Sequence, residues 1–195
     1  MLIDKYLAGL FKAMEERGDP DESDDLKAAF GASGEDIARL LNAYPDCPQT
    51  LIELLNRIDG TYWRMYGDRE IAVAVLASMD NEYPHYLLSA AQMADDKDET
   101  DTIADIYGED AADWLEIDKA INTYNPIGNW LHFTDCVNNG GTSRLYIDFD
   151  PAPGGVKGQI IEYVHDPDQY TVIADSFDAY LKGIIAKGYP FLEEE

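Results

Sequence analysis

Apolar residues recur at helical spacing through the first part of the chain. Between positions 2 and 14 they lie three or four residues apart, which predicts an amphipathic helix. The run RGDPDESDD that follows combines Gly, Pro and acidic residues and predicts a solvated connector. A short helix is expected over residues 35–43. The clearest helix lies in DCPQTLIELLNRIDG, which carries four apolar residues on one face and ends on a glycine.

The middle of the chain mixes two patterns. Ile71, Val73 and Val75 alternate with small residues, as in a strand. From Ser89 the pattern becomes helical, and the acidic centre of AAQMADDKDETDTIADIYG either continues the helix or separates two shorter ones. The stretch EDAADWLEIDKAINTYNP is ambiguous between helix and loop, and Pro126 ends it.

After Pro126 the strand pattern predominates. The segments NWLHFTD, SRLYIDF, GGVKGQIIEYVHD and YTVIAD predict strands, with NNGG as the turn between the first two. A final helix is expected to begin at Asp175 or Ser176, whose side chains can cap it.

The net charge of the chain limits the classes of molecule that it is expected to bind. Fourteen Lys and Arg residues against 39 Asp and Glu residues give a net charge of −25. This field repels nucleic acid and anionic lipid and favours encounter with basic proteins, although solubility alone explains the composition equally well. We therefore expect a basic protein partner and no binding to nucleic acid or membranes, and the sequence leaves a homodimer open.

The sequence shows no evident secretory signal or membrane-spanning segment, and a cytoplasmic location is expected. No apolar run approaches the roughly 20 residues that a membrane-spanning helix needs. The first segment lacks the basic start and unbroken apolar stretch of a secretory signal. Cys47 and Cys136 lie far apart and outside any CxxC pair, which is typical of reduced thiols.

Asp148 and Asp150 are the clearest candidates for chemistry. In an extended strand both would point to one side of the sheet, roughly 7 Å apart. That spacing suits a two-carboxylate mechanism or a hard metal ion, so one alternative is a small metal-assisted hydrolase that uses both. The other interpretation is the polar face of a strand whose opposite face is core. No EF-hand, HExxH or zinc spacing accompanies the pair, and we assign no catalytic, metal-binding or cofactor-binding residue.

The segment GTYWRMYGDRE suggests binding instead. In an expected loop or hairpin it concentrates residue types that are enriched at binding hot spots, among them Tyr62, Trp63 and Tyr66. Alternate members would face the core if the segment were a strand. An aromatic anchor within an acidic surface is what a binder of basic proteins needs.

The ordered motifs of the second half resemble the SUKH superfamily. A tryptophan-led strand, a short glycine turn, a strand of the form LYIDFDP, a GxxGQI strand and an SFDAYL helix follow one another between about residues 46 and 185. The superfamily includes yeast regulators of cell-wall assembly and killer-toxin resistance, and bacterial members that are mostly linked to immunity against toxins. The matching positions are Trp130, Phe133, Gly140, Gly141, Asp148, Asp150, Pro151, Gly154, Gly155, Gly158, Gln159, Ser176, Phe177 and Leu181.

This resemblance implies an α+β fold with a largely antiparallel or mixed sheet flanked by helices. Residues 1–34 would then be an N-terminal helix and acidic connector, and residues 35–195 a single SUKH-like domain. It also implies a non-enzymatic protein-binding module without cofactors, such as a cytoplasmic immunity protein for a nuclease toxin. A regulatory scaffold like the fungal relatives is a further alternative. The candidate partner contacts are Tyr62, Trp63, Tyr66, Asp148 and Asp150.

Overall fold

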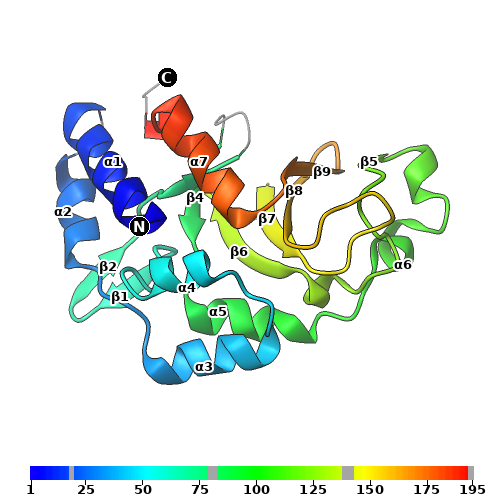
Figure 1. Cartoon of the computed structure of the whole chain (residues 1–195), viewed down its shortest axis with the longest axis horizontal. Coiled ribbons are helices and arrows are strands. Elements are labelled where there is room, and N and C mark those ends of the chain that lie inside the picture. The colour runs from blue at the N-terminus through cyan, green and yellow to red at the C-terminus, as the bar shows by residue number, and fades with distance from the viewer. Residues whose placement is uncertain (18–19, 79–82, 138–142, 193–195) are drawn as a thin grey trace.

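The computed structural model describes residues 1–17, 20–78, 83–137 and 143–192 of the chain. Figure 1 shows most helices gathered at one end of a curled sheet, with a smaller lobe, residues 99–125, at the other end. The fold is α+β, as expected. The expected NNGG turn lies outside the described residues.

The helices begin where the sequence offers a cap. Ser89 and Ser176 each accept a backbone N–H in the first turn of the helix that follows, and Ser33 does the same. The described helices are α1 (Leu2–Arg17), α2 (Pro20–Ala28), α3 (Gly34–Ala43), α4 (Gln49–Leu55), α5 (Ala90–Asp95), α6 (Ile103–Tyr107) and α7 (Phe177–Lys187). Short 3-10 turns lie at η1 (Asp96–Asp98), η2 (Ala111–Asp113), η3 (Ile127–Asn129) and η4 (Pro190–Leu192).

Two expectations about the helices need correction. The supposed connector forms α2, because it begins with Pro20 and two acidic residues and buries Leu26. The leucine-rich helix α4 ends at Leu55, well before Gly60. Gly60 is required for another reason: its φ is +87°, and a Cβ there would lie 2.6 Å from the backbone nitrogen of Ser89.

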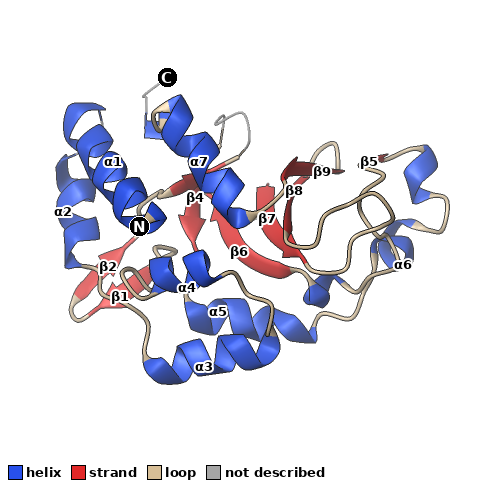
Figure 2. Cartoon of the chain, viewed as in Figure 1, coloured by secondary structure: helices blue, strands red, loops and turns tan. Residues whose placement is uncertain are grey.

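The main sheet has the strand order β3-β4-β6-β7-β8-β9-β5. All neighbours are antiparallel except β5, which runs parallel to β9, so the sheet is largely antiparallel with one parallel edge (Figure 2). The hairpin β1–β2 is separate. The strands are β1 (Arg64–Tyr66), β2 (Arg69–Ile71), β3 (Leu76–Ala77), β4 (Pro84–Leu87), β5 (Glu116–Ile117), β6 (Leu131–Cys136), β7 (Ser143–Asp148), β8 (Gln159–Val164) and β9 (Gln169–Ala174).

Each face of the sheet carries its own apolar core. Alternate residues of β7 point to opposite faces, so that Leu145 and Ile147 join the helices of the first core and Tyr146 joins a second core. The second core fills the space between the sheet and the lobe. It contains Ile103, Ala111, Leu115, Ile121, Trp130, Tyr146, Ile161 and Tyr170.

The N-terminal helix α1 is part of the first core. Tyr6 and Leu10 are fully buried there, and the Tyr6 hydroxyl donates to the carbonyl of Val75. The hydroxyl of Tyr189 donates to the carbonyl of Tyr6 at 2.8 Å. The helix is therefore an integral part of the core, while the division of the chain at residue 34 stays a prediction. None of the described helices has the length and apolar character needed to cross a membrane.

Candidate partner-binding site

Hydrogen bonds and an ion pair anchor the β1–β2 hairpin to the residues around Asp59 and Gly60. Arg64 pairs with Asp59, which is 2% exposed and also accepts the N–H of Ala90 at 2.9 Å. Tyr66 is buried, and its hydroxyl donates to the carbonyl of Gly60 at 2.8 Å. These contacts fix the hairpin to the body of the protein.

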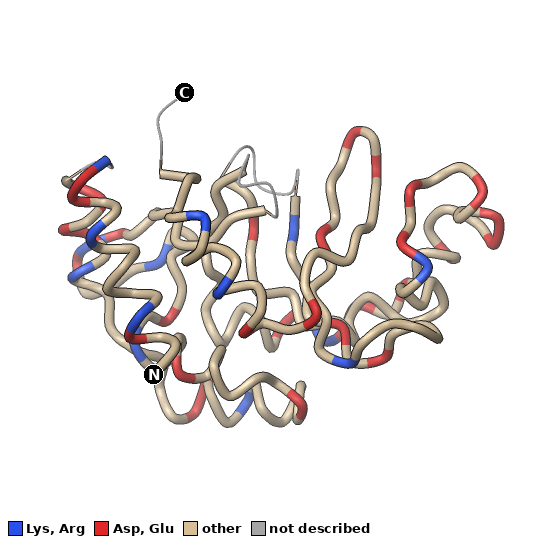
Figure 3. Tube along the Cα trace, turned by 45° about the horizontal axis from the view of Figure 1, so that its top comes forward, with Lys and Arg blue, Asp and Glu red and all other residues tan. Residues whose placement is uncertain are grey.

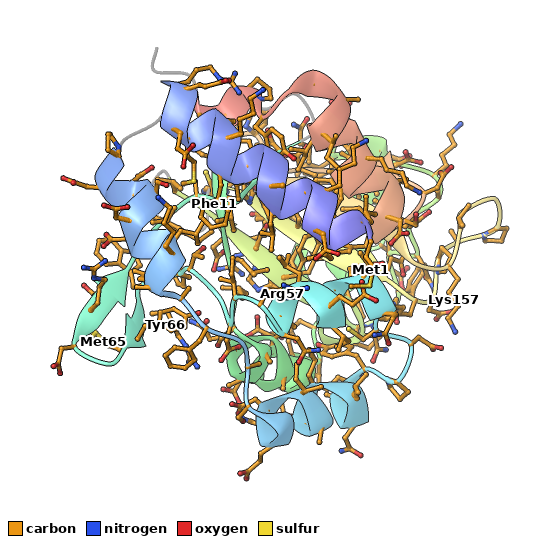
Figure 4. The ribbon with its side chains drawn as sticks, turned by 60° about the vertical axis from the view of Figure 1, so that its left-hand side comes forward. Met1, Phe11, Arg57, Met65, Tyr66 and Lys157 are labelled. Carbon is orange, nitrogen blue, oxygen red and sulfur yellow. The ribbon has the colours of Figure 1, made fainter. Side chains whose placement is uncertain are left out.

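Two large apolar side chains of this hairpin face solvent. Trp63 is 59% exposed and Met65 is 55% exposed, and Figure 4 shows Met65 projecting away from the body. The φ of Trp63 is +49°, a left-handed conformation that costs a bulky residue roughly 1–2 kcal/mol. Met65 pairs across the hairpin with Glu70, so an apolar and an acidic side chain share one face. A strained backbone that presents an aromatic residue to water points to a functional surface.

The structure separates the three aromatic candidates. Trp63 is exposed, Tyr62 is half-buried with its ring 5.5 Å from that of Tyr86, and Tyr66 is buried. Tyr66 therefore offers no surface to a partner, which corrects its place in the candidate set. Met65 takes its place because neighbouring residues of a strand point to opposite sides. Contact of Trp63 and Tyr62 with a partner stays a prediction.

Asp148 is also an interior residue. It ends β7, is 0% exposed, and accepts the N–H of Asp150 at 2.9 Å and the amide of Gln159 at 3.0 Å. Burial raises the pKa of Asp148, and these hydrogen bonds oppose the shift. Asp150 lies beyond the strand and is exposed. The two carboxylates therefore share no open polar face, because the strand ends between them and the second core covers that side of the sheet.

This geometry gives the hydrolase alternative no support. Both oxygens of Asp148 already accept hydrogen bonds. Within the described parts of the chain, no group of three or more His, Cys, Asp or Glu side chains is placed to hold a metal ion. Asp148 acts as the acceptor that closes the turn after β7.

A cavity of about 360 Å³ opens on the second face of the sheet, beside the lobe. The acidic segment at η1 forms one wall with Asp95, Asp96, Asp98 and Glu99. The other wall consists of Ile127, Trp130, His132, Arg144 and Tyr146. The sequence alone does not reveal this cavity, because its two walls come from segments far apart in the chain.

The cationic groups of this cavity are already neutralised. His132 lies between Asp96, with Nδ1 to Oδ2 at 2.6 Å, and Asp135, with Nε2 to Oδ1 at 3.4 Å. Burial disfavours the charged imidazole of His132, but hydrogen bonds to Asp135 and Asp96 outweigh it and raise the pKa. The Nε of Arg144 is 3.3 Å from Asp135. The carboxylates of η1 and the lobe thus dominate this end of the molecule, as Figure 3 shows.

Several motif residues that suggested a family prove to hold the fold together. Asp148 and Gln159 are hydrogen-bonded, Gly158 has a φ of +91°, and Ser176 caps α7. These contacts give physical reasons for the residue types that the resemblance rests on.

Two comparisons with known proteins bear on the family of the chain. A comparison with curated proteins found no match. The family model described as the SMI1 / KNR4 family (SUKH-1) matches residues 31–183, so the match starts earlier than the resemblance at residue 46 and includes α3. Because this match spans well over half of the chain, the protein belongs to the SMI1/KNR4 (SUKH-1) family.

Proposed function

We propose that this protein is a non-enzymatic module that binds a basic protein, and most concretely a cytoplasmic immunity protein that neutralises a toxin by occupying it. Membership of the SUKH family supports a non-catalytic module of this kind. The observation that carries the proposal is the pair of exposed side chains Trp63 and Met65 on a fixed hairpin. The net charge of −25 adds the attraction to a basic partner.

A nuclease toxin is the partner that best fits this charge. The active site of a nuclease binds phosphate and is therefore basic, so an acidic protein competes with nucleic acid for it. Electrostatic steering accelerates association at low ionic strength, because salt screens charges over about 8 Å at physiological concentration. We expect the association rate to fall as salt is added.

The test begins with capture of the partner, using the tagged protein and the products of reading frames that flank its gene. Trp63→Ala is expected to weaken binding by about 2 kcal/mol or more, as for a hot-spot tryptophan. Titration calorimetry with the purified partner measures the difference. Trp114→Ala is the matched control, because Trp114 is 60% exposed at the opposite end of the molecule. Unchanged affinity of Trp63→Ala, with the fold intact, would remove the hairpin from the interface.

The identity of the captured protein separates immunity from scaffolding. A partner that arrests growth when expressed alone, and no longer does so when co-expressed with this protein, supports the immunity role. A harmless cellular protein as the partner supports the regulatory scaffold instead.

A further inference from the structure

The β1–β2 hairpin forms a two-stranded sheet of its own within the described part of the chain. Its turn has two residues, of which Gly67 has a φ of +66°, and Tyr66 and Arg69 form the pair that closes it. The pair that flanks a two-residue turn is hydrogen-bonded, and bonded and open pairs alternate along an antiparallel ladder. Met65 and Glu70 are therefore an open pair, whose N–H and C=O groups point away from the hairpin.

The two edges of the hairpin differ in their surroundings. The helix α2 lies on the β2 side, where the guanidinium of Arg69 donates to the carbonyl of Asp24 at 3.1 Å and pairs with Asp25 at 3.2 Å. Figure 1 shows β1 on the side of the hairpin that faces away from α2. Neither backbone polar group of Met65 has a hydrogen bond to a described residue. The β1 edge therefore offers one donor and one acceptor to another chain.

Exposed strand edges are usually protected by a proline, a bulge or an outward-pointing charge, because they pair readily with other chains. The strand β1, which is described in full, has no such protection: Met65 is exposed, and the side chain of Arg64 turns inward to Asp59. We infer that this edge receives an extended segment of the basic partner, which adds a third strand to the hairpin. The inference rests on the proposed function and states how the partner is held.

The side chains around this edge favour a segment that combines apolar and basic residues. Trp63 and Met65 offer exposed apolar surface. Asp68 and Glu70 are exposed, and neither forms an ion pair with a described residue, whereas both arginines of the hairpin are already paired with carboxylates. In strand addition the main chain supplies affinity and alternate side chains supply specificity. The occupant that fits is therefore an extended strand with basic residues among apolar ones.

Met65→Pro tests the main-chain hydrogen bond, because proline has no N–H. The hairpin is expected to tolerate this change, since the lost N–H points outward from the edge of a sheet. Met65→Ala is the comparison, because alanine keeps the N–H and shortens the side chain. We expect the captured partner to bind Met65→Pro at least about tenfold more weakly than Met65→Ala, the change for a lost hydrogen bond that leaves an acceptor unsatisfied.

Glu70 provides the matched control on the other edge. Its N–H also points outward, but on the side where α2 lies. Glu70→Pro is expected to bind the partner within about twofold of Glu70→Ala, as for residues outside the energetic centre of an interface. Circular dichroism and thermal unfolding show whether each proline variant keeps the fold.

A second measurement needs neither a partner protein nor a proline variant. It uses the full chain and two peptides of equal charge: acetyl-Lys-Val-Lys-Val-Lys-Val-amide, which can form a strand, and acetyl-Lys-Pro-Lys-Pro-Lys-Pro-amide, which cannot. Isotope-labelled methionine restricts the NMR spectrum to methionine amides, and Met65→Leu identifies the signal of Met65 by its loss. The valine peptide is expected to shift this signal and to slow exchange of its N–H with solvent. The signals of Met14 and Met93, which are buried in helices, are expected to stay in place.

Three results would overturn the inference: no shift of the Met65 signal with the valine peptide, equal effects of both peptides, or equal binding of the partner by Met65→Pro and Met65→Ala. The peptide experiment also separates the inference from the proposed function. If the valine peptide pairs with β1 but no basic partner is found, the proposed function alone is discounted. If Trp63→Ala weakens the partner but Met65→Pro behaves as Met65→Ala does, strand addition alone is discounted.

Discussion

Replacement of Asp148 by alanine is expected to lower the free energy of unfolding by about 3 kcal/mol, because two donors, one of them fully buried, lose their acceptor. These donors are the N–H of Asp150 and the amide of Gln159, at 2.9 and 3.0 Å. The raised pKa of Asp148 limits the loss, since the ionised carboxylate is itself disfavoured by burial. Urea unfolding followed by tryptophan fluorescence measures the change.

Asp150→Ala is the matched control for this prediction. Asp150 is exposed, and its contact with Asp148 uses the backbone N–H, which alanine retains. A change within about 0.5 kcal/mol is expected there. If the two variants unfolded at the same urea concentration as the original protein, Asp148 would not be the acceptor that holds the turn.

Acid is expected to destabilise the protein through His85. Burial lowers the pKa of His85 from 6.5 to about 3. Between these values the unfolded chain binds a proton that the folded protein does not. The free energy of unfolding therefore falls as the pH is lowered from 6.5, by up to about 1.4 kcal/mol per pH unit from this group alone. Summed down to pH 3, the loss is about 4–5 kcal/mol.

The effect of His85 is measured as the difference in free energy of unfolding between the original protein and His85→Gln. The many carboxylates titrate in both proteins, so their contribution largely cancels. Glutamine can keep a polar contact with Thr134, whose hydroxyl lies 2.8 Å from Nδ1 of His85. The stability advantage of the original protein at pH 7 is expected to shrink by about 3 kcal/mol by pH 4. Parallel stability curves would contradict the prediction. The same replacement at the exposed His165 controls for the loss of an imidazole that water still reaches.

The pKa of His132 shifts in the opposite direction to that of His85. Because its pKa is raised in the folded state, its contribution to stability is complete below the unfolded value and is lost as the pH rises through the folded value. His132 therefore adds nothing to the loss of stability below pH 6.5.

Helix caps and the alternation of apolar residues, which can be recognised in the sequence, correctly predicted several helices and strands. Ser89 and Ser176 begin α5 and α7, and the strands after Pro126 follow the alternation of apolar residues. The helix α2 was missed because its polar sequence buries little beyond Leu26. Its helical state depends on contact with α1 and β2, which no local pattern encodes.

The candidate site was less predictable because it depends on register and on long-range contacts. Tyr66 and Met65 are neighbours with similar apolar character, and only the hairpin register shows which one faces solvent. Asp148 resembles a surface carboxylate until the lobe is placed over that face of the sheet. The cavity walls meet only after β6 and β7 bring Trp130 and Tyr146 beside η1.

The family match ends at residues 31 and 183, yet the chain closes its core beyond both limits. Tyr6 and Tyr189 meet there with ring centroids 5.5 Å apart, and a Cβ on Gly9 would collide with the Tyr189 hydroxyl at 2.3 Å. A relative that lacks these terminal segments must seal the same side of its core with different residues. A piece of this chain cut to residues 31–183 would therefore leave the side of the core around Tyr6 and Leu10 open to water.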